Sequence, residues 1–252
     1  MPVVTIHQPN MSKIPQIREY QGLPVVTAEK MKYLDKIASM EYAMPELALM
    51  ENAGAAISRE TVAFAKETLL KESAGLKVAV CCGRGNNGGD GLVAARCLKA
   101  SGAAPEVFIL APSEKGYGDL TVKNLERARA EGVEITLVEK QNIEALAEKF
   151  SCSDLLLDAL LGAGSVGKPT GPVRRVIQLM NKSLKPIIAV DIPSGLSPDT
   201  GHHSGVFITA RVTFTLGFAK TGLMANHAKP NTGEIKVLDI GYPKELVVKA
   251  GR

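Results

Sequence analysis

Residues 77–91, KVAVCCGRGNNGGDG, join an apolar run to a glycine-rich loop. The run VAVCC at 78–82 is apolar at every position, which is typical of a parallel strand that is covered on both faces. The loop GRGNNGGDG at 83–91 places five glycines among two amides, one arginine and one carboxylate, and it leads into a helical pattern at 89–101. This order of strand, glycine loop and helix predicts the first unit of a Rossmann-like α/β sheet.

The alternation of apolar runs and helical patterns continues along the chain. Further strands are predicted at 107–111, 135–138, 155–161, 186–192, 212–218 and 234–241, and further helices at 119–131, 141–150 and 172–183. Two helices precede the first strand: Thr27 is a suitable N-cap for one, and the other begins at Pro45 and contains Gly54, which indicates close approach by another backbone. We therefore predict an irregular arm, residues 1–25, and a single domain, residues 26–252, with a doubly wound, mostly parallel sheet.

The composition is that of a soluble globular protein, with 45% hydrophobic and 22% charged residues among 252. The 30 basic and 26 acidic residues are dispersed, and the lack of a basic run argues against a nucleic-acid partner. No stretch reaches the ~20 apolar residues that span a bilayer, and residues 1–24 lack the apolar segment of a signal peptide. The four cysteines form no C-x-x-C pair, as expected in a reducing compartment. We predict a cytoplasmic protein with no membrane partner.

The glycine loop allows three interpretations. Residues 83–88 spell G-x-G-x-x-G, but a nicotinamide dehydrogenase would carry an acid at the end of the next strand, where Ala111, Pro112 and Ser113 stand. A Walker phosphate loop is excluded because no G-K-[ST] follows. The N–H groups of a helix that starts near Gly89 favour an anion such as phosphate, while a turn without a ligand remains the alternative.

Polar residues also follow two later strands. Asp158 interrupts an apolar strand, and a buried aspartate needs a cation, donors or a metal; a purely structural aspartate is the alternative. Because carboxyl ends of parallel strands share one edge, Asn87, Asp158 and Ser194 offer three oxygen ligands with one formal charge. Such a set suits a large monovalent cation better than a transition metal.

Asp191 follows a strand and precedes a proline–glycine turn, so its carboxylate is held on a stiff corner. That placement suits general acid or base work, although a turn-forming aspartate is the alternative. Ser194 is not predicted to be a nucleophile, because no G-x-S-x-G elbow occurs.

Five segments carry a resemblance to a known family. They are LALMENAG at 47–54, CGRGNNGGDGLVAARCL at 82–98, LLLDALLGAGSVGK at 155–168, AVDIPSGLSPDTG at 189–201 and TFTLGFAKTGL at 213–223. In this order, across roughly residues 27–243, they resemble the YjeF N-terminal-domain family, the NAD(P)H-hydrate epimerases. The chain departs from that family at Arg84, where a proline or small residue is common, and at FAKTG, which replaces the frequent L-P-K-P-G.

The resemblance implies an isomerase that interconverts the R and S forms of hydrated NADH and NADPH, whose S form a separate dehydratase repairs. It assigns the dinucleotide substrate to Asn86, Asn87, Gly88, Gly89, Asp90, Gly162, Ala163, Gly164, Ser165, Val166, Gly167, Lys168 and Asp191. It assigns a potassium ion (K+) to Asn87, Asp158 and Ser194. For the proton transfers we predict Asp191, with Lys220 as the second candidate.

Two alternatives and two further expectations accompany this prediction. The same domain occurs as a non-catalytic interaction scaffold, but the intact N-N-G-G-D, Asp158, Asp191 and Ser194 favour catalysis. A nucleotide hydrolase or deacetylase would need a nucleophile or metal cluster that the sequence lacks. Many relatives are fused to a dehydratase domain, which we expect to be absent here, and the leading helices and arm predict a homodimer.

Overall fold

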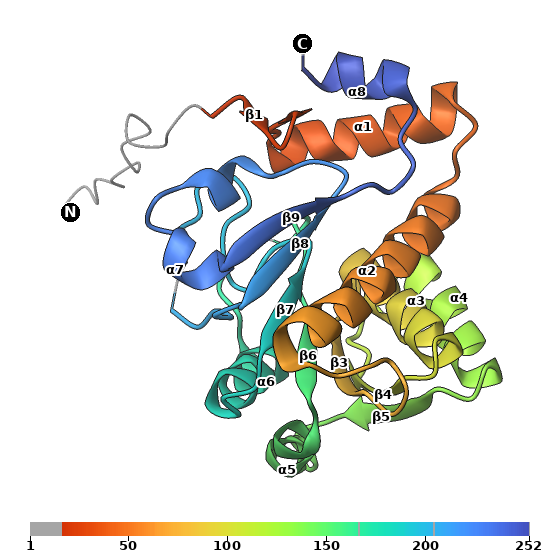
Figure 1. Ribbon diagram of the computed structural model, residues 1–252, viewed down its shortest axis with the longest axis vertical. Helices are drawn as coiled ribbons and strands as arrows, with labels where there is room; N and C mark the ends of the chain where they lie inside the picture. Colours follow the sequence, from red (N-terminus) through yellow and green to blue (C-terminus); the bar gives the residue numbers. More distant parts are fainter. Residues whose placement is uncertain (1–16, 166, 204, 252) are drawn as a thin grey trace.

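The structure is a computed structural model that describes residues 17–165, 167–203 and 205–251. Its centre is a seven-stranded sheet in the order β5-β4-β3-β6-β7-β8-β9, in which every neighbouring pair is parallel (Figure 1). The strands are β3 Lys77–Cys82, β4 Ala104–Leu110, β5 Glu134–Val138, β6 Leu155–Ala159, β7 Ile187–Val190, β8 Val212–Leu216 and β9 Glu234–Leu238. The predicted doubly wound sheet is confirmed.

The order in which strands are added to this sheet reverses once. It starts at β3, adds β4 and β5 on one side, and then crosses to β6 and adds β7, β8 and β9 on the other. The loops after β3 and β6 therefore leave the sheet in opposite directions from adjacent strands. Ligands of open α/β sheets bind at such a switch point, beyond the carboxyl ends of the strands.

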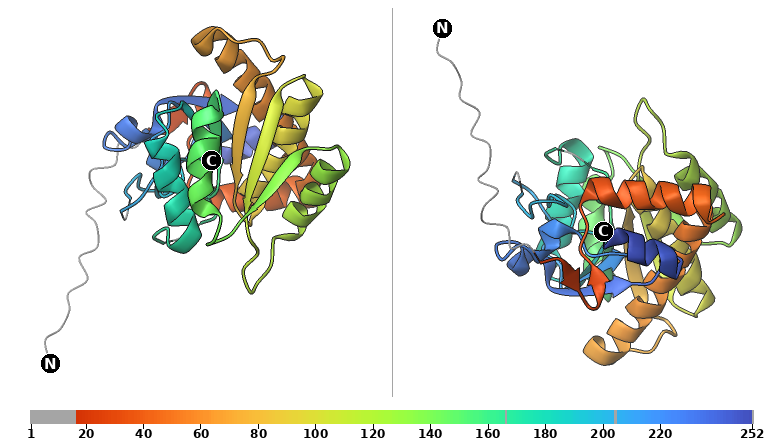
Figure 2. Two further views of the ribbon diagram at one scale, coloured as in Figure 1. Left: turned by 90° about the horizontal axis from the view of Figure 1, so that it is seen from below. Right: turned by 90° about the horizontal axis from the view of Figure 1, so that it is seen from above.

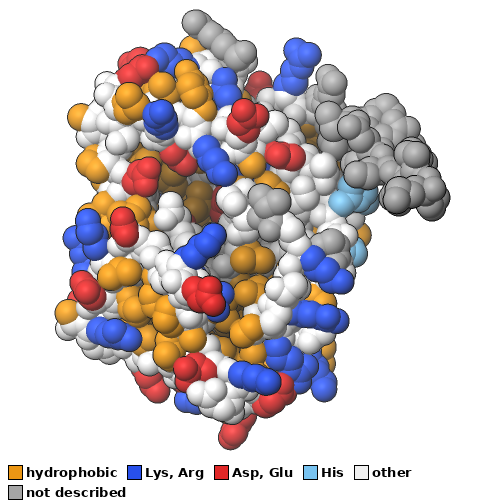
Figure 3. Space-filling view, turned by 180° about the vertical axis from the view of Figure 1, so that it is seen from behind, with side chains coloured by type: hydrophobic (Ala, Val, Ile, Leu, Met, Phe, Trp, Pro, Cys, Tyr) orange, Lys and Arg blue, Asp and Glu red, His pale blue; other side chains and the backbone are white. Residues whose placement is uncertain are grey.

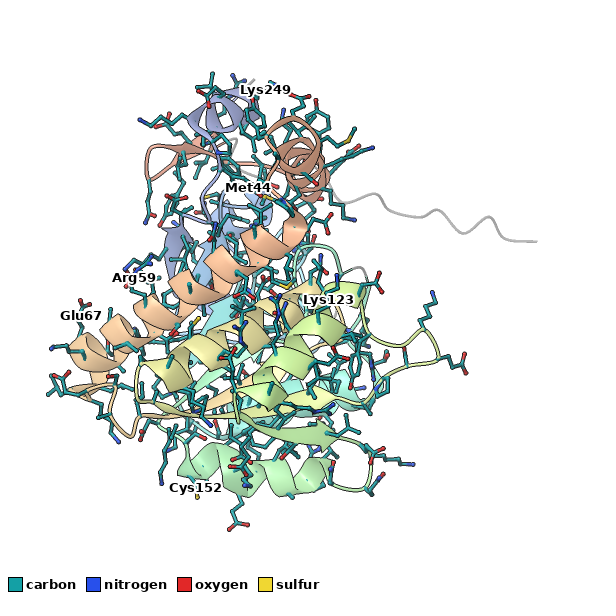
Figure 4. The ribbon with its side chains drawn as sticks, turned by 90° about the vertical axis from the view of Figure 1, so that its right-hand side faces the viewer. Met44, Arg59, Glu67, Lys123, Cys152 and Lys249 are labelled. Carbon is teal, nitrogen blue, oxygen red and sulfur yellow. The ribbon has the colours of Figure 1, made fainter. Side chains whose placement is uncertain are left out.

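Two layers of helices cover the sheet (Figure 2). On one face lie α2 Glu46–Leu69, α3 Asn86–Ala100 and α4 Asp119–Ala130, and on the other lie α5 Leu146–Cys152 and α6 Gly171–Lys182. Figure 4 shows this separation, with Lys123 on α4 and Cys152 on α5 at opposite sides of the sheet. Alternate residues of β3 enter the two cores, Val78 and Val80 on one face and Ala79 and Cys81 on the other. A strand buried on both faces explains why the run is apolar throughout.

Helix α3 begins at Asn86 rather than near Gly89, so the predicted start was three residues late. The two asparagines and two glycines of N-N-G-G-D therefore lie inside the helix, where propensity alone disfavours them. Close packing overrides propensity here. A Cβ added at Gly88 would lie 2.1 Å from the carbonyl oxygen of Gly83, which only glycine permits.

Two predictions about the N-terminal helices, the N-cap at Thr27 and the close approach at Gly54, are confirmed. Thr27 caps α1 Ala28–Glu41, with its Oγ1 accepting a hydrogen bond from the Lys30 N–H at 3.1 Å. A Cβ at Gly54 of α2 would lie 2.9 Å from the backbone nitrogen of Ala94 in α3, which confirms the predicted close approach. Helix α1 also packs against α8 Lys244–Ala250, an element that the sequence did not predict.

The predicted irregular arm is wrong for its last part. Residues 19–24 form an antiparallel ribbon, β1 Glu19–Tyr20 and β2 Leu23–Pro24, and Tyr20 Oη and Gln21 Nε2 each donate to the Ile235 carbonyl oxygen at 3.1 Å. The ribbon is thus fixed to β9, and residues 1–16 of the predicted arm lie outside the described residues. Three short helical turns complete the described chain, η2 Ile143–Ala145, η3 Thr221–Met224 and α7 Lys229–Thr232. Across the described ranges, no helix has the length and apolar character to cross a membrane.

Candidate active site

A cleft of about 600 Å³ opens at the carboxyl edge of the sheet, above the switch point between β3 and β6. Its walls come from α1, the first turns of α2 and α3, the loop after β6 and the ends of β7 and β8. The space-filling view shows a recess on the rear face, with hydrophobic side chains in its wall and acidic ones beside them (Figure 3). The cleft thus combines apolar walls with a few ionisable groups, as small-molecule sites commonly do.

The glycine loop forms one border of this cleft through close packing. A Cβ at Gly83 would lie 1.8 Å from the Leu160 carbonyl oxygen, and one at Gly91 would lie 2.6 Å from Ala159 Cβ. None of the five glycines of the loop, all of them described, has a positive φ. Gly83, Gly88 and Gly91 are therefore required by close packing at the ends of β3 and β6, and not by a left-handed turn, whereas Gly89 faces Met50 of α2 and a Cβ at Gly85 would have no atom within 4 Å.

The first turn of α3 faces the cleft. Gly85 is its N-cap and provides no side-chain hydrogen bond, so the first N–H groups of the helix are available to an anion. Two hydrogen bonds from the start of α4 hold the loop: Thr121 Oγ1 donates to the Gly85 carbonyl oxygen at 2.9 Å, and the Gly118 N–H donates to the Arg84 carbonyl oxygen at 2.9 Å.

Asp158 and Ser194 are joined beneath the cleft, and neither is exposed to solvent. The backbone N–H of Ser194 donates to Asp158 Oδ2 at 2.8 Å, and its hydroxyl donates to Oδ1 at 2.6 Å. The Leu161 N–H donates to Ser194 Oγ at 2.9 Å, which ties this pair to the loop after β6. Burial raises the pKa of Asp158 to about 6, and the hydrogen bonds from Ser194 limit the rise.

Asn87 is the third predicted cation ligand, and its amide is an orphan in the structure. Its side chain is buried, and neither Oδ1 nor Nδ2 has a hydrogen-bond partner among the described residues. A Cβ at Gly162 would lie 3.3 Å from Asn87 Oδ1, so the amide lies against the same loop that contacts Ser194. A buried amide without a partner is costly, and an ion or ligand at this place would relieve that cost. The donor set therefore fits a monovalent cation.

Asp191 and Lys220 form a buried ion pair at the other border of the cleft. Lys220 Nζ donates to Asp191 Oδ1, to the Leu216 carbonyl oxygen at 2.9 Å and to Thr215 Oγ1 at 3.3 Å. Asp191 Oδ2 accepts a hydrogen bond from the Ala163 N–H at 3.0 Å. Lys220 is 1% exposed while the Asp191 side chain keeps 13%, so the carboxylate is the member that a ligand can reach.

Asp191 also has a φ of 66°, in the left-handed region. Aspartate and asparagine tolerate this region better than most residues, and strained backbone is often found at functional sites. The sequence placed Asp191 on a stiff corner, and the structure has this corner at the end of β7, where the Asp191 N–H donates to the Phe214 carbonyl oxygen at 2.8 Å.

Sequence reasoning missed Asp35, an acidic group in the cleft besides the predicted Asp90 and Asp191. Asp35 of α1 accepts a hydrogen bond from the Tyr242 hydroxyl, and burial raises the pKa of Asp35. Burial also raises the pKa of Asp90 well above its ordinary value, with repulsion from Asp191 and Asp35 adding to the rise. Asp35 lies four residues after Met31 on the apolar stripe of α1, and a carboxylate on a buried stripe was the signal available.

The structure brings most of the predicted site together. The cleft is lined by Asn86, Asn87, Asp90, Gly162, Ala163, Gly164, Ser165, Asp191 and Lys220. Gly88 and Gly89 are buried in α3, while Gly167 and Lys168 are exposed and do not line the cleft. Val166 lies outside the described residues.

The parallel doubly wound sheet and the cleft at its switch point define a Rossmann-like α/β protein with a ligand site at the carboxyl edge. The chain belongs to the family described as YjeF-related protein N-terminus, which it matches over residues 46–222.

Relatives in this family extend the comparison. The chain is 38% identical over 227 residues to an "NAD(P)H-hydrate epimerase" of Elusimicrobium minutum, covering 90% of this chain and 100% of that protein. It is also 38% identical to a "Bifunctional NAD(P)H-hydrate repair enzyme Nnr" of Thermofilum pendens, of which it spans 41%. The crystal structure of yeast ynu0, YNL200c, superposes with a TM-score of 0.76 at 26% identity, covering 91% of this chain and 94% of that one.

Proposed function

We propose that this chain is an NAD(P)H-hydrate epimerase that interconverts the R and S forms of hydrated NADH and NADPH. The observation that carries the proposal is the 38% identity to a relative of that name along its whole length. The ion pair of Asp191 and Lys220 in the cleft supplies suitable chemistry. A non-catalytic scaffold of the same fold is the alternative, and no observation favours it.

The reaction inverts one carbon, C6, and needs proton transfers to and from the oxygen that this carbon carries. The ring nitrogen beside C6 forms a C=N bond as the C6–O bond breaks, and the hydroxyl takes a proton and leaves as water. Water then adds to C6 from the opposite face and releases one proton, so atoms and charge balance over the cycle. Asp191 is our candidate to transfer these protons, because its carboxylate reaches the cleft.

Lys220 has a supporting position in this proposal. Its three hydrogen bonds, to Asp191, Thr215 and Leu216, use the three protons of an ammonium group. The side chain therefore orients the Asp191 carboxylate and neutralises its charge in the cleft. Direct proton donation by Lys220 remains the second candidate.

The substrate and the cation would occupy the two sets of groups described above. The diphosphate would lie at the first turn of α3, beside Gly162, Ala163 and Gly164. Asn87, Asp158 and Ser194 would hold potassium, which supplies a positive charge beneath the phosphates.

Three expectations accompany the function. The S form is the product that a separate dehydratase would consume, and the longer bifunctional repair enzymes among the relatives support such a partner. A cytoplasmic location and a homodimer stay predictions; size-exclusion chromatography with light scattering would test the dimer.

The test begins with pure R-form hydrated NADH and follows the S form by chromatography. The S form should appear faster with the intact protein than with a heat-inactivated sample. Asp191→Asn should lower this rate by about 10²–10⁴-fold. Asparagine keeps the size of the side chain and tolerates a positive φ, so the fold should persist. Glu67→Gln, at the exposed end of α2 (Figure 4), is the matched control. An undiminished rate in Asp191→Asn would show that this residue does not act in the mechanism. Equal rates in intact and heated samples would show that the protein does not catalyse the reaction.

A further inference from the structure

The cleft has two chemically different ends. Asp191 and Lys220 pair at one end, beyond β7 and β8, and Arg84 and Leu110 line the other, at the ends of β3 and β4. Four strand intervals of about 4.8 Å separate β4 from β8, so the two ends lie on the order of 19 Å apart. An elongated ligand can therefore reach both ends at once.

The cations that border the cleft indicate which way a dinucleotide would lie in it. At the β8 end, Lys220 uses its three protons on Asp191, Thr215 and Leu216 and offers none to a phosphate. The guanidinium of Arg84 provides positive charge at the β4 end. With the reacting ring beside Asp191 and the diphosphate at α3, the adenosine half must extend towards β4.

Arg84 is fixed at the end of β4. Its Nε donates to the Ala111 carbonyl oxygen at 2.5 Å, and Ala111 follows directly after β4. Within the described chain this is the one acceptor for its side chain, so the two terminal amino groups stay available to a ligand. Arg84 is half-buried, which keeps its long side chain ordered at the border of the cleft.

Tyr117 packs at the same place. Tyr117 Oη donates to the Leu110 carbonyl oxygen at 2.9 Å, which places its ring beside the end of β4. Burial raises the pKa of Tyr117, and the charge of Arg84 opposes that rise. Because the neighbouring Gly118 N–H donates to the Arg84 carbonyl oxygen at 2.9 Å, Tyr117 and Arg84 lie together at the end of β4.

The end of the second strand is where dinucleotide folds distinguish their two cofactors. An acid there binds the ribose 2′-hydroxyl of NAD, whereas an arginine accommodates the 2′-phosphate of NADP. Ala111, Pro112 and Ser113 supply no acid, and Glu114 beyond them is exposed. A phosphate monoester carries nearly two negative charges at pH 7, and the planar fork of arginine binds it through two parallel hydrogen bonds.

We infer that Arg84 binds the 2′-phosphate of hydrated NADPH, and that the chain prefers this substrate to hydrated NADH. The inference rests on the proposed function for its substrate. It makes Arg84 a specificity-determining residue, at the position where the chain departs from the resembling sequences.

The test compares Arg84→Ala with the unaltered protein on both hydrated substrates. With hydrated NADPH, kcat/KM should fall by about 10–100-fold, chiefly through KM, because a charge-assisted contact to the bound ground state is lost. With hydrated NADH, it should change less than about threefold. Arg84→Lys should restore part of the loss. Lys123→Ala, which removes an exposed charge from α4 (Figure 4), is the matched control.

Binding of NADP⁺ and NAD⁺ provides a readout that does not need catalysis. Calorimetry should give tighter binding of NADP⁺, and Arg84→Ala should remove the difference. Equal binding of the two, or an equal loss with both substrates in Arg84→Ala, would overturn the inference. A protein without epimerase activity that still binds NADP⁺ through Arg84 would defeat the proposed function alone.

Discussion

Asp158 connects burial, ionisation and cation binding at the scale of one residue. Its carboxyl group is wholly buried, and burial raises its pKa to about 6. The folded state therefore favours the protonated form. The stability that this preference contributes is complete below the ordinary pKa of 3.8 and is lost as the pH rises through about 6. A cation at Asn87 and Ser194 would offset that loss, because it binds the ionised carboxylate.

Potassium should accordingly stabilise the protein in a pH-dependent way. We expect potassium chloride to raise the melting temperature more than choline chloride does at pH about 8, and to lose this advantage at pH about 5. In Asp158→Asn the melting temperatures in potassium chloride and choline chloride should be equal at pH about 8 as well as at pH about 5. Scanning fluorimetry measures each melting temperature. The same potassium effect at both pH values would contradict a role for the Asp158 carboxylate.

At the scale of elements, local sequence predicted every strand of the large sheet but not every boundary. The apolar runs marked the inner strands β3, β4, β6, β7 and β8 because burial on both faces leaves no alternation to misread. The start of α3 was missed because Gly88 and Gly89 are weak helix formers, and their place depends on contacts with Gly83 and Met50. The ribbon β1–β2 was missed for a similar reason, since it is fixed by hydrogen bonds to Ile235, more than 200 residues away.

The candidate site divides in the same way. Asp158 and Asp191 were predictable, because Asp158 interrupts an apolar strand near its carboxyl end and Asp191 directly follows another. The contacts of Arg84, Asp35 and Tyr242 could not be predicted. Arg84 donates to the Ala111 carbonyl oxygen and Tyr242 donates to Asp35, and tertiary packing brings both pairs together.

Gly54 tests the contact between α2 and α3. Alanine would gain about 1 kcal/mol from helix propensity. Its Cβ would lie 2.4 Å from Val93 Cβ and 2.9 Å from the Ala94 nitrogen, and such overpacking costs about 1–3 kcal/mol. Gly54→Ala should therefore lower the free energy of unfolding by about 1 kcal/mol, as measured by urea denaturation. Ala55→Ser on the exposed face should change it by less than about 0.5 kcal/mol. Stabilisation by Gly54→Ala would show that the helices can separate at no cost.

At the scale of the whole molecule, distant segments close one end of the fold. Val26 bridges to Lys220, and the Ala28 N–H donates to Asp199 Oδ1 at 2.7 Å. Leu34 of α1 and Leu246 of α8, both 0% exposed, belong to the main core. Figure 1 shows α8 lying along α1 above the sheet.

Removal of one side chain from α8 should therefore weaken the entire domain. Leu246→Ala should lower the free energy of unfolding by about 2–4 kcal/mol, because it leaves a cavity between α8 and α1. Val248→Ala, on the exposed face of the same helix, should cost less than about 0.5 kcal/mol. Urea denaturation measures both variants, and similar losses in the two would mean that α8 does not stabilise the core.

This closure has a consequence for a chain emerging from the ribosome. The N–H of Ala28 meets Asp199 171 residues later, an interval of roughly 10–30 s at ordinary elongation rates. Helix α8 is made later still, so until it has been synthesised the apolar stripe of α1, with Met31 and Leu34, lacks its partner from α8. The helix made first is thus among the last to dock, and the cleft that it borders is complete only once Lys220 and α8 have joined it.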